Sequence, residues 1–116
     1  MIKVNFPGVR ADMSLNARLH WAVRARKARE LKEVVGWMLK GRKPPVMPMV
    51  IHLTRISPRL MDDDNSVGAL KNFRDAVAEW IGIDDGKLNW QYRQRKGSWS
   101  VEMMIEEEGD DARDRG

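Results

Sequence analysis

Two short acidic runs contain the residues whose types and spacing could perform chemistry. One is the run Asp-Asp-Asp-Asn from Asp62 to Asn65, and the other is Asp84-Asp85, twenty residues after Asp64. Carboxylates that share a site repel one another, so such a cluster needs a cation to offset its charge. Oxygen ligands suit a hard cation, Mg²⁺ or Mn²⁺, better than Zn²⁺. The sequence therefore predicts a divalent-cation site, and beside a basic surface its use would be phosphodiester hydrolysis.

Each acidic run also has an ordinary structural explanation. Asp or Asn before a helix is a good N-cap, and negative charge suits the N-terminal end of the helix dipole. Asp84-Asp85-Gly86 is likewise a common turn sequence. A cap needs only one such residue, however, and three aspartates precede Asn65. That excess is the reason to consider metal binding beside the structural explanation.

Charge is distributed unevenly along the 116 residues, whose formal net charge is +4. Residues 1–61 hold 13 Lys/Arg and 3 Asp/Glu, whereas residues 62–86 hold 2 and 7. Residues 87–105 hold 4 Lys/Arg and 1 Asp/Glu, and residues 106–116 hold 2 Lys/Arg and 6 Asp/Glu. Basic segments around an acidic centre suit a nuclease, with Lys and Arg on the phosphate backbone and carboxylates on the metal. The alternative is an ordinary charged surface.

Composition and length exclude several classes of protein. Without cysteine, the chain cannot use thiol catalysis, disulfides or Cys-ligated zinc. Its length corresponds to one domain, which can bury a core of its own. The start lacks the apolar segment of a signal peptide, and no apolar run approaches the length of a membrane span. We therefore expect a soluble, cytoplasmic protein without a membrane partner.

Apolar periodicity predicts an α+β fold in a single domain. Alternating apolar residues indicate strands at 2–6, 49–54, 88–92 and 99–105, and the last two form a β-hairpin around Lys96-Gly97. A helical period indicates one helix ending near Lys40 and another over roughly 65–81. We therefore expect a small mixed β-sheet of about four strands with two main helices over residues 1–105. Residues 106–116 have no apolar period and are predicted to be an acidic, disordered tail.

The start of the first helix is the least regular part of this pattern. Its apolar stripe consists of Leu31, Val34, Val35 and Met38. When that stripe is extended backward at 100° per residue, Arg24 and Lys27 fall on it. The helix is therefore predicted to begin near Ala25, with residues 12–24 irregular or separately helical.

The acidic runs belong to a longer ordered set of residues. Asp62-x-Asp64-Asn65, then Lys71, then Asp75-Ala76-Val77, then Asp84-Asp85 resembles the signature of RusA-type Holliday junction resolvases, which are common in phages and prophages. The resemblance covers roughly residues 59–96, with a weaker match over 16–21. It implies a RusA-like domain and a homodimeric, Mg²⁺-dependent endonuclease that cuts four-way DNA junctions symmetrically in recombination and repair.

The resemblance also implies roles for individual residues. Asp62, Asp64 and Asp85 correspond to the catalytic carboxylates that bind the metal. Lys71 corresponds to the catalytic lysine, which would offset charge developing on the phosphoryl oxygens. Asn65 would orient the loop backbone or a ligand, and Asp84 would likewise support the metal ligands.

The spacing before Lys71 departs from the family pattern. The family usually has two residues between the Asn and the Lys, whereas Ser66 to Leu70 intervene here. Three extra residues are nearly one helical turn. Lys71 would therefore point to the same side of the helix as the family lysine, displaced by about 4.5 Å along the helix axis. The alternative role for Lys71 is a surface pair with Asp75.

DNA contacts are predicted from basic side chains in two segments. The first segment contributes Arg24, Arg26, Lys27, Arg29, Lys40, Arg42 and Lys43. The second, at the predicted hairpin tip, contributes Arg93, Arg95 and Lys96. His52 is interpreted as a packed, hydrogen-bonded strand residue, and nothing supports a role for His20. Three alternatives remain open: a non-catalytic DNA-binding protein with a structural acidic cluster, a related Mg²⁺ nuclease acting on flaps or replication forks, and a small scaffold protein whose acidic loop binds an ion for stability.

Overall fold

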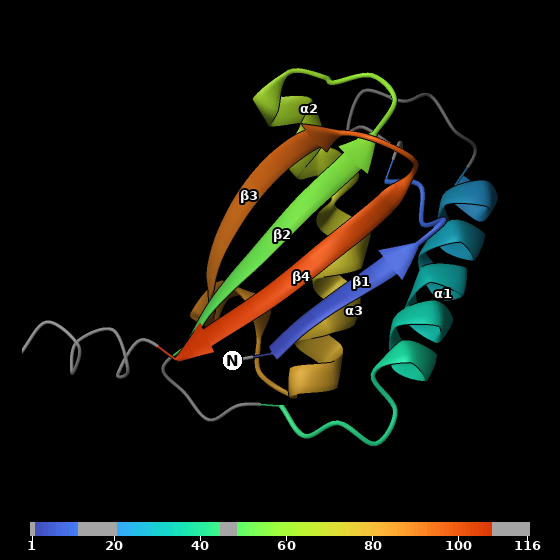
Figure 1. The fold of residues 1–116 in the computed structure, drawn as a ribbon. Coiled ribbons are helices and arrows are strands. Elements are labelled where there is room, and N and C mark those ends of the chain that lie inside the picture. The colour runs from blue at the N-terminus through green and yellow to red at the C-terminus, as the bar shows by residue number, and fades with distance from the viewer. Residues whose placement is uncertain (1, 12–20, 45–48, 108–116) are drawn as a thin grey trace, which may run out of the picture.

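The computed structural model describes residues 2–11, 21–44 and 49–107, except for the side chains of Asp63, Asp85 and Glu107. The elements are β1 (Ile2–Pro7), α1 (Trp21–Met38), β2 (Met49–Ser57), α2 (Asp63–Ala69), α3 (Lys71–Ile81), a 3₁₀ turn η1 (Asp85–Lys87), β3 (Asn89–Lys96) and β4 (Ser100–Glu107). The strands form one sheet in the order β1-β4-β2-β3, with α3 behind it and α1 packed beside α3 (Figure 1). The expected α+β class, with a mixed sheet of four strands, is confirmed.

Strand β2 is central and makes the sheet mixed. It pairs antiparallel with β4 and parallel with β3, and β4 pairs antiparallel with β1 on its other edge. The predicted β-hairpin is therefore wrong, because β3 and β4 lie on opposite sides of β2. Alternation and a turn sequence are local signals, and they do not show that another strand occupies the space between two segments. Parallel pairing of β2 with β3 instead uses α2 and α3 as the crossover connection.

The core lies between the sheet and the two long helices. On β2, Met49, Ile51 and Leu53 are fully buried, and β4 contributes the same alternation at Val101, Met103 and Ile105. The rings of Phe6 on β1 and Phe73 on α3 meet edge to face, with centroids 4.9 Å apart. Full burial of a large apolar side chain stabilises the fold by about 1.5–3 kcal/mol, so this layer is the main source of stability.

Helix α1 differs from its predicted start and its predicted buried face. It begins at Trp21 rather than Ala25, and its fully buried residues are Val35 and, just past its end, Leu39. Val34 and Met38, assigned to the apolar stripe, are exposed. Arg24 is half-buried and does not end the helix, because the methylene stem of an arginine can lie along apolar surface while its charged head reaches outward.

The predicted helix over 65–81 is two helices. Leu70 separates α2 from α3, yet its backbone keeps a helical conformation (φ −87°, ψ −4°) and its amide still bonds to the carbonyl of Ser66 at 3.0 Å. Gly68 has low helix propensity and lies just before the break. The predicted end near residue 81 is confirmed, since α3 ends at Ile81 and Gly82 caps it with φ 82°.

Three strands extend well beyond their predicted ends. β2 continues from Thr54 through Ser57, and β3 continues from Tyr92 through Lys96. β4 continues through Glu106 and Glu107, which were assigned to the tail. Backbone pairing between β2 and β4 extends the strands here, regardless of side-chain polarity. Residues 108–116 of the predicted tail, and residues 12–20 of the segment predicted to be irregular or separately helical, lie outside the described residues. Among the described helices, none has the length and apolar character needed to cross a bilayer.

Gly97 lies where the chain from β3 to β4 crosses the end of β2. Its amide donates to the carbonyl of Ser57 at 3.0 Å, and a Cβ at this position would lie 2.9 Å from Cγ2 of Ile56. That space is too small for a methyl group without movement of the β2 end. The close crossing therefore depends on glycine.

We expect Gly97→Ala to lower the free energy of unfolding by about 1–3 kcal/mol, because overpacking forces neighbouring atoms to move. Urea unfolding followed by circular dichroism measures the change. Gly36→Ala in α1 is the control, because its added methyl group would meet no atom within 4 Å, and the better helix former should raise stability by about 1 kcal/mol. Equal stability of Gly97→Ala and the parent would contradict the tight crossing.

Candidate acidic site

The first acidic run lies just beyond the carboxyl end of β2, at the start of α2 (Figure 1). Asp62 occupies the N-cap position, and its backbone carbonyl accepts the amide of Ser66 at 2.9 Å. Its carboxylate, however, makes no capping hydrogen bond and is exposed, as is Asp64. The capping explanation therefore accounts for the backbone of Asp62 and leaves its side chain available for a ligand.

The second acidic run lies at the other end of the parallel strand pair. Asp84 accepts the amide of Gly86 through Oδ1 at 3.2 Å, so this residue makes the turn that the structural explanation expected. Asp85 begins η1, which leads into β3 where Asn89 pairs with Val50 near the start of β2. The turn therefore lies at the end of β2 opposite to Asp62 (Figure 1).

Two independent lengths estimate the separation of the acidic runs. Met61 is hydrogen-bonded to Gln94, and the five steps along β3 from Asn89 to Gln94 correspond to about 16 Å. Helix α3, with 11 residues, spans a similar length of about 16 Å. A single Mg²⁺ holds its ligand oxygens at about 2.1 Å. Within one chain, the backbone therefore keeps the two runs farther apart than the ligands of one cation.

The predicted convergence of Asp62, Asp64 and Asp85 stays a prediction. Among the described side chains, no group of three His, Cys, Asp or Glu could hold a metal ion. The side chains of Asp63 and Asp85 lie outside that set. As a donor set, Asp62 and Asp64 supply carboxylate oxygens, the ligand type that Mg²⁺ prefers.

Lys71 is the first residue of α3 and is exposed. The extra residues before it are helical, because α2 continues through Ala69 and Leu70 keeps a helical backbone. In the described part of the chain, Lys71 makes no ion pair with Asp75, which instead lies 3.8 Å from the guanidinium of Arg74. The surface-pair alternative for Lys71 is thus not realised here. Asn65, the other polar residue of the signature in this region, is half-buried.

The predicted DNA-binding residues fall into three groups on the surface. Lys27 lines a cavity together with Ala69 and Asn72, so the first half of α1, with Arg24, Arg26 and Arg29, lies beside the α2–α3 junction. The second group is Arg93, Arg95 and Lys96, exposed on β3 alongside the last residues of β2. Both groups therefore flank the end that carries Asp62. The third group comprises Lys40, Arg42 and Lys43, which follow the end of α1 at Met38. Lys40 is 13 residues after Lys27, which corresponds to about 20 Å along the helix axis.

One of these basic residues, Arg95, is engaged in an ion pair. Nη2 of Arg95 lies 2.8 Å from Oε1 of Glu102 on β4, across the uncovered face of the sheet. The pKa of the Glu102 carboxyl is lowered from its ordinary value of 4.5, chiefly because it accepts this hydrogen bond. Arg93 is also exposed on β3 and has no ion-pair partner among the described residues, so it is the better placed of the two for phosphate.

The remaining candidates behave as ordinary structural residues. His52 is mostly buried, and its Nε2 lies 3.3 Å from Oε2 of Glu106, which matches the interpretation of a packed, hydrogen-bonded residue. His20 lies outside the described residues. Trp21 and Trp37 on α1 are 75% and 73% exposed, and Nζ of Lys40 lies 5.3 Å from the centroid of the Trp37 ring. Trp90 packs against the core.

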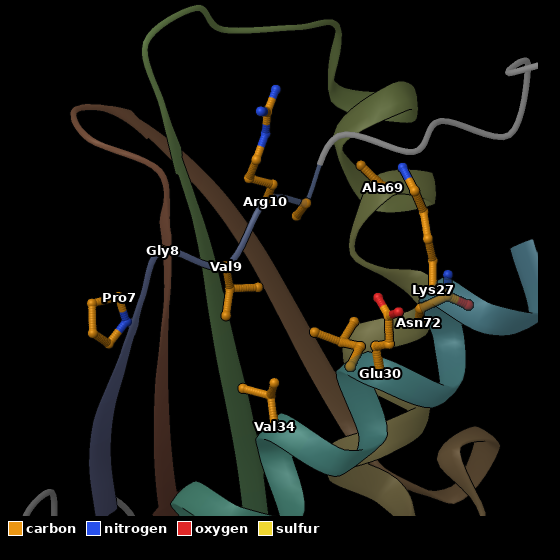
Figure 2. Close-up of a pocket in the computed structure, with 11 residues that line it drawn as sticks. Pro7, Gly8, Val9, Arg10, Lys27, Glu30, Val34, Ala69 and Asn72 are labelled. Carbon is orange, nitrogen blue, oxygen red and sulfur yellow. The ribbon is translucent and has the colours of Figure 1, made fainter. Parts of the chain in front are cut away.

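A cavity of about 520 Å³ lies between α1, the α2–α3 junction and the chain that follows β1. Figure 2 shows Lys27, Glu30 and Asn72 on one side of it, with Val9 and Arg10 on the other. None of Asp62, Asp64 and Lys71 lines this cavity. The cavity and the acidic pair are separate features of the surface.

Two residues beside the acidic loop were not predicted from the sequence. Arg55 is a buried arginine at the end of β2, and Gln94 is its partner on β3. Both side chains bond to the loop that carries Asp62. The available signal was a charged residue two positions after Leu53, on the buried side of an alternating strand.

Comparison with known proteins adds a relative without an assigned activity. No protein-family model matches the chain. The chain is 35% identical over 98 aligned residues to an uncharacterized protein of Xylella fastidiosa (strain Temecula1 / ATCC 700964). The alignment takes in 76% of this chain and 63% of that protein, so the chain spans less than two thirds of the relative's length. The resemblance to RusA-type resolvases therefore stays a prediction.

We expect Glu102→Gln to lower the melting temperature at neutral pH, with a difference from the parent that disappears in acid. Because the folded-state pKa of Glu102 is lowered, its charge stabilises the fold above the unfolded-state value and loses that effect as pH falls through the folded-state value. Thermal unfolding at neutral pH and below pH 4.5 measures this. Glu33→Gln, an exposed acid on α1, is the control, and a pH-independent difference would contradict the ion pair's role.

Proposed function

We propose that this protein is a Mg²⁺-dependent endonuclease that acts as a homodimer in the cytoplasm and resolves four-way DNA junctions in recombination and repair. The observation that carries the proposal is the state of Asp62, which holds the N-cap position with a carboxylate that does not cap the helix. Asp64 lies two residues further and is also exposed. Two uncommitted carboxylates at the end of a strand, between two basic groups, suit metal-assisted phosphodiester hydrolysis.

Each residue of the proposed site has a defined task. Asp62, Asp64 and Asp85 supply carboxylate oxygens to Mg²⁺, which when bound would activate water and offset charge on the scissile phosphate. Lys71 lies at the start of α3 and places an ammonium group where phosphoryl oxygens gain charge. The exposed basic residues on α1 and β3 hold the phosphate backbone on either side.

The separation of the acidic runs requires two chains for one site. Asp62 and Asp64 of one copy would share a cation with Asp85 of the other, because the runs lie about 16 Å apart along the parallel strands of one chain. Two-fold symmetry then generates two such sites. Two symmetric sites suit the two symmetric cuts that resolve a four-way junction.

We expect Asp64→Asn to abolish cleavage of a synthetic four-way junction in Mg²⁺ while leaving junction binding intact. The substitution is nearly isosteric, and it removes one negative charge that repels phosphate. Cleavage and binding are measured on the junction and on a linear duplex, with and without Mg²⁺, and Glu33→Gln serves as the charge-matched control. A parent that binds DNA but never cuts would instead indicate a non-catalytic DNA-binding protein. Cutting of flaps or forks in preference to the junction would indicate a nuclease for other branched DNA.

Mixing two inactive variants extends this experiment to the two-chain site. In a heterodimer of Asp64→Asn and Asp85→Asn, both substitutions fall in one shared site and leave the other site intact. The mixture should therefore recover nicking of a single strand of the junction. If each site lay within one chain, both sites of the heterodimer would be damaged and no activity would return.

We expect Lys71→Ala to slow single-turnover cleavage by about 100-fold without changing the fold, because the ammonium would stabilise charge that appears only in the transition state. Lys32→Ala is the control, since this exposed lysine on α1 pairs with Glu79 at 3.1 Å and such pairs contribute little to stability. A rate close to that of the parent would show that Lys71 has no part in the chemical step.

A further inference from the structure

The buried face of the parallel strand pair changes from apolar to polar at its carboxyl end. On β2 the core-facing residues Met49, Ile51 and Leu53 are followed on the same face by Arg55 and Ser57, all of them buried. On β3, Gln94 occupies the matching position and is the register partner of Arg55. The carboxyl end of parallel strands is where open sheets with helical crossovers hold their ligands. The polar change is therefore located where a site is expected.

Arg55 binds the loop after β2 through its guanidinium group. The side chain is 2% exposed, and its Nη1 donates to Oγ of Ser57 at 2.6 Å and to the carbonyl of Arg59 at 3.3 Å. Oγ of Ser57 donates to the same Arg59 carbonyl at 2.7 Å. Nε of Arg55 donates to the carbonyl of Ala11, and its guanidinium lies over the ring of Trp99 at 5.2 Å. The guanidinium is thus fixed from several sides and fixes Arg59.

Gln94 binds the next part of the same loop. Its Oε1 accepts the amide of Met61 at 3.1 Å, and its Nε2 donates to the carbonyl of Met61 at 2.7 Å. The same Oε1 also accepts from Nη1 of Arg55 at 3.4 Å. Both backbone polar groups of Met61 are therefore bound by one side chain, and Asp62 is the next residue.

We propose that Arg55 and Gln94 are positioning residues that hold the segment from Arg59 to Met61 so that Asp62 presents its carboxylate to the cation. This inference rests on the proposed function. A metal ligand held by neighbouring hydrogen bonds binds without first being ordered, and loss of such support typically costs 10- to 100-fold in metal affinity. A role in stability alone would change unfolding but not the affinity of the folded protein for metal.

Gln94→Met is the variant of choice. The change keeps the length of the side chain and removes both hydrogen bonds to Met61, whereas any change at the buried Arg55 endangers the fold itself. Gln91→Met is the matched control, because Gln91 lies on the same strand, is exposed and bonds only to Asn89 at 3.4 Å among the described residues. Circular dichroism and thermal unfolding show first that both variants are folded.

Two measurements are made on the folded proteins. Titration with Mn²⁺, followed by the paramagnetic resonance signal of the free ion, gives metal affinity, and amide hydrogen exchange by NMR reports the order of the Met61 backbone. We expect Gln94→Met to weaken Mn²⁺ binding by about 10-fold or more and to speed exchange at Met61, while Gln91→Met changes neither. Addition of Mg²⁺ should displace Mn²⁺ from the same site.

The outcomes separate this inference from the proposed function. Mn²⁺ affinity of Gln94→Met equal to that of the parent would overturn the positioning role, even if the parent binds metal and cleaves junctions. A parent that neither binds Mn²⁺ nor cuts DNA would overturn the proposed function itself. Faster exchange at Met61 in a protein without metal binding would show a structural role for Gln94, which also contradicts the inference.

Discussion

The parallel pairing of β2 with β3 is the constraint on which the rest of the structure depends. Parallel neighbours cannot be joined by a tight turn, so the chain must return along the length of β2 before β3 begins. Helices α2 and α3 make that return and bring Phe73 and Val77 onto the buried face of the sheet. The same pairing places the end of α3 and the start of β3 at the opposite end of the sheet from the start of α2.

That crossover determines how the acidic residues can cooperate. The run beginning at Asp62 lies at the start of the crossover connection, and Asp84-Asp85 lies at its end. The length of the connection therefore separates the two runs. A cation shared by both runs therefore needs a second chain, and a two-fold axis supplies the complementary half twice. Under the proposed function, the dimer that supplies two symmetric cuts would also build each site.

The carboxyl end of the strand pair combines a rigid support with exposed charge. Arg55, Ser57 and Gln94 use hydrogen-bonding groups at positions where the preceding residues of both strands are apolar or aromatic. A buried guanidinium is costly to place unless its donors are satisfied, and here they bind loop carbonyls. The conformation of the loop before Asp62 is thus coupled to the packing of the sheet.

Basic residues on β3 serve the structure as well as the proposed contact with DNA. The described part of the sheet leaves β3 at one edge, where charged side chains discourage pairing with another strand. Arg95 is partly neutralised by Glu102, whereas the neighbouring Arg93 keeps an exposed charge. The edge is therefore protected and basic at the same time.

Local pattern in the sequence was enough to predict the α+β class, a strand beginning at Ile2, the end of a helix near Ile81 and a helix next to the first acidic run, because alternation, capping and turn chemistry act between near neighbours. Only the tertiary structure decided that β3 and β4 flank β2, that α1 buries Val35 and Leu39 rather than Val34 and Met38, and that Arg55 supports the acidic loop. These features depend on which distant segments pair along one strand edge or pack on one face. The apolar periodicity of a segment does not show which distant segment it will pair or pack with. The distance between the two acidic runs was likewise decided only by the tertiary structure, since it follows from the strand order.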